Sequence, residues 1–160
     1  MKLILSSIFF LLLAPCNQSK NISSSKIADN SKVTIVYQCG ACFGRCPEYI
    51  LTINGEKKLA TFKGIKSTEK IGAFSKPISD AELTNFVSDF EKAKFSSLEN
   101  EYLGNITDFP IKSISYTNNG STKSIRIRSG APEVLNSLDR SLKVYAESTD
   151  GWKKSEDANH

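Results

Sequence analysis

Histidine is almost absent from this chain of 160 residues, because the only one is the terminal residue, His160. A catalytic Ser-His-Asp or Cys-His arrangement therefore has no base in the folded part. Zinc sites normally complete their ligands with a second pair of cysteines or histidines, and the sequence offers neither. A phosphate-binding loop needs a helix after its glycines, whereas Gly40, Gly44 and Gly55 lie in turns between predicted strands. The sequence predicts no catalytic residue, no metal site and no cofactor.

Long apolar runs are equally scarce, and the only one covers residues 3–14. A helix of that length spans about 18 Å, against a bilayer hydrocarbon core of about 30 Å. Because the run follows Lys2 and is short, we predict a signal peptide over residues 1–16. Residues 17–32 are rich in Ser, Asn and Lys, which predicts a flexible polar tether.

The end of the leader, Leu13-Ala14-Pro15-Cys16, resembles the Leu–small–small–Cys pattern that closes bacterial lipoprotein signals. The departure is Pro15, at a position where Gly, Ala or Ser is usual. We expect Cys16 to carry a lipid anchor, which would make the membrane a partner and place the protein in the bacterial cell envelope. The alternative is ordinary signal cleavage nearby, which would give a soluble periplasmic or secreted protein.

Charge of one sign is nowhere concentrated, since the net charge is only +4. The densest basic stretch, residues 123–128, has the alternation of a solvated strand face. Nucleic-acid binding needs a basic cluster or stripe combined with stacking aromatics. The sequence therefore predicts no nucleic-acid partner.

Residues 33–152 are predicted to form a single α+β domain. Asn54-Gly55 is the strongest hairpin signal, and it predicts a turn in which both positions have positive φ. Hairpins rather than βαβ crossovers predict an antiparallel sheet of about six strands, with helices packed on it. The predicted strands cover residues 33–37, 48–53, 57–63, 67–74, 111–117 and 122–128.

Two amphipathic helices are predicted to pack on this sheet. Ser79 and Glu82 form a capping box at the start of the first, and Pro132 is expected at the first position of the second. Trp152 is expected to close the edge of the core, and residues 153–160 are predicted to be a disordered tail. The predicted buried stripes are Leu83, Phe86, Val87 and Phe90 in the first helix and Val134, Leu138, Leu142 and Tyr145 in the second.

Three of the four cysteines lie close together in the pattern Cys39-x2-Cys42-x3-Cys46-Pro47. The spacing resembles the last three ligands of a bacterial ferredoxin run, but the first ligand would fall at Val36, which cannot bind iron. A redox pair of Cys39 and Cys42 would be expected to open a helix, whereas a turn and a strand follow here. A structural disulfide in an oxidising compartment is the simpler interpretation, and a loop of about five residues would contribute roughly 2 kcal/mol. These residues by themselves leave the pairing open.

The segment 40–49, Gly-Ala-Cys-Phe-Gly-Arg-Cys-Pro-Glu-Tyr, resembles an uncharacterised bacterial group, domain-of-unknown-function family 6438. Its members look like exported or lipoprotein domains with the signature Cys-Phe-Gly-x-Cys-Pro-x-Tyr. The resemblance covers residues 33–152 and implies the fold and the compartment, but no activity. Because Cys39 lies outside the signature, the resemblance favours a disulfide between Cys42 and Cys46 and leaves Cys39 as a possible free thiol.

These observations predict an exported lipoprotein domain that acts as a non-enzymatic binding or envelope-associated module. The alternative is a thiol-dependent redox protein that uses Cys39 and Cys42. Glu48 and Asp108 could act as carboxylates, but the capping of a turn and solvation are the favoured explanation for both residues.

Overall fold

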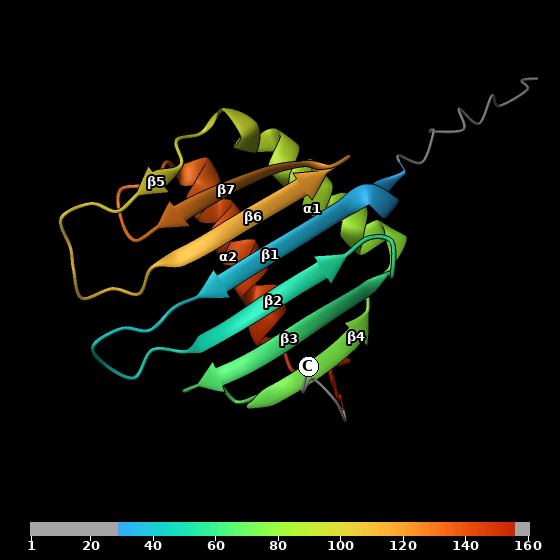
Figure 1. Ribbon diagram of the computed structural model, residues 1–160, viewed down its shortest axis with the longest axis horizontal. Coiled ribbons are helices and arrows are strands. Elements are labelled where there is room, and N and C mark those ends of the chain that lie inside the picture. The colour runs from blue at the N-terminus through green and yellow to red at the C-terminus, as the bar shows by residue number, and fades with distance from the viewer. Residues whose placement is uncertain (1–28, 156–160) are drawn as a thin grey trace, which may run out of the picture.

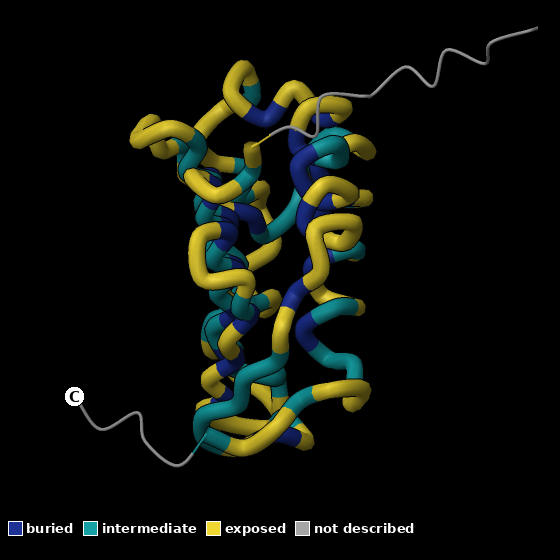
Figure 2. The backbone as a smooth tube through the Cα atoms, turned by 90° about the vertical axis from the view of Figure 1, so that its right-hand side faces the viewer, coloured by how far each residue is buried: buried dark blue, intermediate teal, exposed yellow. Residues whose placement is uncertain are grey.

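The computed structural model describes residues 29–155, and these residues form an α+β domain of two layers (Figure 1). An eight-stranded sheet in the order β5-β7-β6-β1-β2-β3-β4-β8 carries both long helices on one of its faces. Figure 2 shows the two layers from the side. The elements are η1 (Asn30–Lys32), β1 (Val33–Cys39), β2 (Glu48–Asn54), β3 (Leu59–Lys66), β4 (Gly72–Pro77), α1 (Asp80–Lys92), η2 (Phe95–Ser97), β5 (Glu101–Tyr102), β6 (Lys112–Asn118), β7 (Ser121–Ile127), α2 (Glu133–Glu147) and β8 (Lys153–Lys154).

The core lies between the sheet and the helices, because alternate residues of the central strands face α1 and α2. In the central row of the sheet Tyr37 of β1 pairs with Leu51 of β2 and with Ile114 of β6, and all three are buried. Alternation of buried and exposed residues is the pattern of a sheet with one covered face. The predicted α+β class is therefore confirmed.

The predicted number of about six strands is wrong, because β5 and β8 were missed. Each has only two residues, which is too short to show periodicity. β5 pairs parallel with β7, so the sheet is mixed rather than wholly antiparallel. β8 lies at the start of the predicted tail and pairs with β4, where Ser155 N donates to Ala73 O at 2.9 Å. Trp152 packs against Phe62 as part of the same edge, with ring centroids 5.8 Å apart.

The positive φ values predicted at Asn54-Gly55 are absent there and occur instead in the turn of the second hairpin. Asn119 and Gly120, between β6 and β7, have φ of 50° and 81°. Gly55 instead has an ordinary φ and is followed by a longer turn in which Lys58 has positive φ. Glycine is required at position 55 for lack of space, since a Cβ atom there would lie 2.1 Å from Asn30 O.

The capping box and the stripe of α1 are confirmed. The stripe of α2 is wrong at its first position, Val134, and Tyr145 at its end is only partly buried, whereas Ala146 is buried. Val134 is 47% exposed, whereas Leu135 is fully buried. Both residues lie one turn before Leu138, so the helical period allows either, and only the docking of α2 on the sheet selects Leu135. Pro132 is the N-cap of α2 rather than its first residue. The buried face of α2 consists of Leu135, Leu138, Asp139, Leu142 and Ala146.

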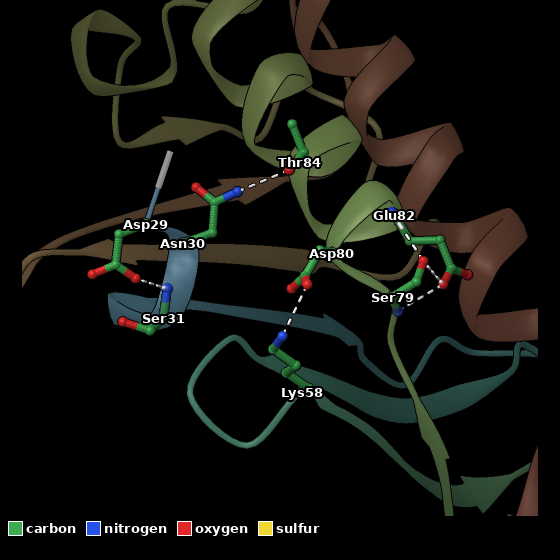
Figure 3. A network of polar contacts seen from close by, with 8 residues as sticks. All are labelled: Asp29, Asn30, Ser31, Lys58, Ser79, Asp80, Glu82 and Thr84. Atoms are coloured by element: carbon green, nitrogen blue, oxygen red, sulfur yellow. Dashed lines mark hydrogen bonds and ion pairs between the residues drawn. The ribbon is translucent and has the colours of Figure 1, made fainter. Parts of the chain in front are cut away.

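The packed part of the chain begins before residue 33, within the segment predicted as a tether. Asn30 Nδ2 donates to Thr84 Oγ1 of α1 at 3.1 Å, and Asp29 Oδ1 accepts from Ser31 N at 3.1 Å (Figure 3). Beside them Lys58 pairs with Asp80 at 2.9 Å. Among residues 29–155, neither helix combines the length and the apolar composition needed to cross a bilayer.

The corrected stripe of α2 leads to a prediction with a matched control. Leu135→Ala should lower the free energy of unfolding by about 2–5 kcal/mol, because it leaves a cavity against the sheet. Val134→Ala should change it by less than about 0.5 kcal/mol, because the side chain is largely in solvent. Urea unfolding followed by circular dichroism measures both. A larger loss in the free energy of unfolding at position 134 than at position 135 would contradict the corrected stripe and support the one predicted from the sequence.

Candidate functional site

The connection between β1 and β2, residues 40–47, is closed by a disulfide between Cys42 and Cys46, whose Cα atoms lie 5.8 Å apart. This is the pair that the family resemblance favours. Gly40 N donates to Ile111 O at 3.0 Å, which ties the disulfide loop to the connection that precedes β6. A Cβ atom at position 40 would lie 2.8 Å from the same carbonyl oxygen, so the close approach requires glycine.

The tip of the disulfide loop carries an aromatic ring in solvent. Phe43 is 93% exposed, and Phe109 of the neighbouring connection is 55% exposed. The two loops enclose an open groove of about 480 Å³. Exposed apolar side chains that cluster around a hollow are typical of a binding surface. We call this hollow the loop groove; its lining includes Ala41, Phe43, Thr107, Phe109, Ile111 and Arg128.

Arg128 directly follows β7 and contributes the cationic group of the loop groove. Its Nε atom is buried, and in the part of the chain that the structure describes no acceptor lies within hydrogen-bonding distance. Arg126, two residues earlier, is instead paired with Glu101 at 2.7 Å. Arg128 is therefore a cation in the groove wall that the surrounding residues do not neutralise.

A second cluster of polar residues lies between the sheet and α2, behind the disulfide loop. Tyr37 OH donates to Asp139 Oδ1 at 3.0 Å, and the Lys112 ammonium pairs with Asp139 Oδ2. Burial and the neighbouring Asp139 carboxylate raise the pKa of Tyr37 far above its usual range. The tyrosine is therefore a neutral donor at any ordinary pH, and this cluster serves to hold α2 on β1 and β6.

The same arrangement recurs at the end of α2. Tyr49 OH of β2 donates to Glu147 Oε1 at 3.2 Å. Burial, followed by the Glu147 charge, also raises the pKa of Tyr49 beyond its usual range. The hydroxyl groups of both tyrosines thus donate hydrogen bonds to carboxylates of α2, so neither is free to act on a ligand.

Cys39 is the free cysteine, and it is buried at the end of β1 with 7% of its surface exposed. Burial raises the pKa of its thiol, although the neighbouring Lys112 partly opposes this. A reactive thiol needs the opposite conditions, namely exposure and a lowered pKa. Cys42, its supposed redox partner, is bonded to Cys46. The redox alternative based on Cys39 and Cys42 is therefore not supported.

The other residues considered in the sequence analysis do not line the loop groove. Cys16 and His160 lie outside residues 29–155. Glu48 begins β2 at an irregularity of its pairing with β3. Asp108 accepts a hydrogen bond from Thr107 Oγ1 at 3.4 Å. Within the described range, no three His, Cys, Asp or Glu side chains are grouped as metal ligands would be.

Sequence reasoning missed Phe109 and Arg128 as parts of a site. The alternation of residues 123–128 indicates a solvated strand face for Arg128, and no local pattern indicates that a residue directly after β7 lines a groove. Phe43 did carry a signal, because a ring inside a five-residue disulfide loop has little room to fold back onto a core.

The family model described as domain of unknown function (DUF6438) matches residues 33–146, from the first residue of β1 to the last turn of α2. Both loops of the groove lie within this range. A search of curated proteins found no match.

The Asp139 cluster leads to a prediction about stability. Asp139→Ala should cost about 3–5 kcal/mol, because it leaves Lys112 and Tyr37 without their partner. Tyr37→Phe should cost about 1–2 kcal/mol, since Lys112 still pairs with the carboxylate. Asp89→Ala, which removes an exposed partner of Lys92, should cost less than about 0.5 kcal/mol. Equal effects of Asp139→Ala and Asp89→Ala in urea unfolding would show that the cluster does not hold α2.

Proposed function

Because the chain belongs to the domain-of-unknown-function family DUF6438, we propose a function from the geometry of its own candidate site. The protein is an exported bacterial lipoprotein that acts as a non-enzymatic binding module of the cell envelope. It is held at the membrane by a lipid on Cys16, and it binds a protein partner through the loop groove.

The exposure of Phe43 carries this proposal. An aromatic ring that is 93% exposed gains about 1.5–3 kcal/mol when a partner buries it. The disulfide restricts the backbone that carries the ring, so binding loses less backbone conformational entropy than it would in an open loop. Buried aromatic anchors of this kind dominate the energetics of protein interfaces.

The chemistry of the cysteines supports export. A disulfide on a surface loop persists in oxidising compartments and is rare in the cytosol. The apolar leader and Cys16 at its end agree with this compartment. The non-enzymatic assignment is supported by Cys39, a buried thiol with a raised pKa, and by tyrosines that are occupied by the carboxylates of α2.

The direction of β1 supports attachment at one end of the domain and binding at the other. β1 begins beside the first described residues and ends beside the disulfide loop (Figure 1). Seven residues of strand extend over about 23 Å. A lipid on Cys16 would therefore be attached to the domain at the end opposite the loop groove.

The anchor is tested by the mass of the mature protein. The chain expressed with its leader in a bacterium should be recovered from membranes as a diacylated or triacylated species beginning at Cys16. Cys16→Ser should release the protein in soluble form. An unmodified mature chain beginning at Asn17 would contradict the lipid anchor.

The binding surface is tested by site-specific crosslinking in cells of the organism that encodes the protein. Photoreactive benzoylphenylalanine in place of Phe43 should yield a discrete protein adduct. The same probe in place of Glu56, exposed in the turn at the opposite end of β2, should yield none. Equal adducts at both positions, or none at Phe43, would contradict a binding surface at the loop groove.

A further inference from the structure

The loop groove combines apolar walls with a single unpaired cation. Phe43, Phe109 and Ile111 line it, and Arg128 is the only charged side chain in its lining. The buried Nε of Arg128 has no acceptor among residues 29–155. Because Nε is enclosed, a ligand in the groove can reach only the rest of the guanidinium group, which shares the same delocalised charge.

The acceptor does not come from neighbouring acidic residues. Asp108 lies on the same connection as Phe109, but its carboxylate accepts from Thr107 and makes no ion pair with Arg128. Glu101 is engaged with Arg126, on the strand that leads to Arg128. Within residues 29–155 the Arg128 guanidinium therefore has no carboxylate partner, and an anionic group of a ligand would complement its charge.

We propose that the loop groove binds a peptide segment in which a carboxylate lies next to a large apolar side chain. The carboxylate pairs with the Arg128 guanidinium, whose planar fork of donors matches a carboxylate. The apolar side chain packs between Phe43 and Phe109. This inference rests on the proposed binding function and names the chemistry of the partner.

The shape and charge of the groove favour a peptide over a lipid surface. A hollow of about 480 Å³ is within the usual size of a pocket that encloses a small ligand or a few side chains. Anionic membranes are bound by clusters of several lysines and arginines on one surface, whereas one partly buried arginine lines this groove. An apolar wall around it also strengthens a single ion pair, because water is partly excluded.

The proposal is tested with two isosteric peptides and the mature chain carrying Cys16→Ser. N-acetyl-Leu-Asp-Phe-Glu-amide should shift the backbone amide resonances of residues 40–43, 107–109 and 111 in titrations followed by nuclear magnetic resonance. N-acetyl-Leu-Asn-Phe-Gln-amide should bind at least about tenfold more weakly, because it lacks the charge that Arg128 recognises.

Arg126 provides a matched control for Arg128. Arg128→Gln should reduce the preference for the acidic peptide to less than about twofold, whereas Arg126→Gln should leave it unchanged. Arg128→Lys keeps the charge without the planar fork and should retain part of the preference. If Arg128→Gln disturbs the fold, the comparison of the two peptides on the unaltered groove still decides the question.

Several results would overturn the proposal. These are absence of binding by both peptides, equal binding of both, shifts outside the two loops, or equal effects of the two arginine substitutions. Binding to phosphatidylglycerol vesicles that is lost with Phe43→Ser but unchanged with Arg128→Gln would assign the groove to a lipid surface instead. Crosslinking at Phe43 without a peptide preference would refute only the ligand class. A peptide preference without crosslinking in cells would refute the proposed function.

Discussion

The arrangement of the two layers depends on the Asp139 carboxylate. It projects from the buried face of α2, accepts a hydrogen bond from Tyr37 of β1 and pairs with Lys112 of β6. A carboxylate buried without such partners is strongly unfavourable, so registers of α2 that separate these groups are disfavoured. Apolar burial supplies most of the attraction between helix and sheet. The polar contacts then select where along the sheet α2 lies.

The candidate site is an extension of the same strands. Cys39 is the last residue of β1, and Gly40 begins the disulfide loop. Ile111 immediately precedes Lys112, the first residue of the neighbouring strand β6. The Gly40 N–H to Ile111 O hydrogen bond therefore joins two loops whose bases are already held by the sheet and α2. The disulfide restricts the outer part of the first loop. A groove built from loops thus keeps a defined shape, with its apolar rings in solvent.

Local signals were sufficient wherever a residue's immediate neighbours decide its conformation. Ser79 and Glu82 form the predicted capping box within one helical turn. The same reasoning failed at Gly55, where contact with Asn30 rather than turn geometry selects glycine. It also failed at Val134, because helical periodicity cannot distinguish two adjacent residues without knowing which side the sheet covers.

The sequence by itself determined the fold class, the start of α1, the buried stripe of α1 and the group of cysteines from which the disulfide is drawn. Each follows from the spacing of residues within about a dozen positions. Only the tertiary structure decided that Cys39 is buried, that Tyr37 contacts a carboxylate 102 positions away and that Arg128 lines a groove with Phe43. These contacts join residues that no local pattern relates, because sheet pairing and helix docking bring them together only when the whole core is formed.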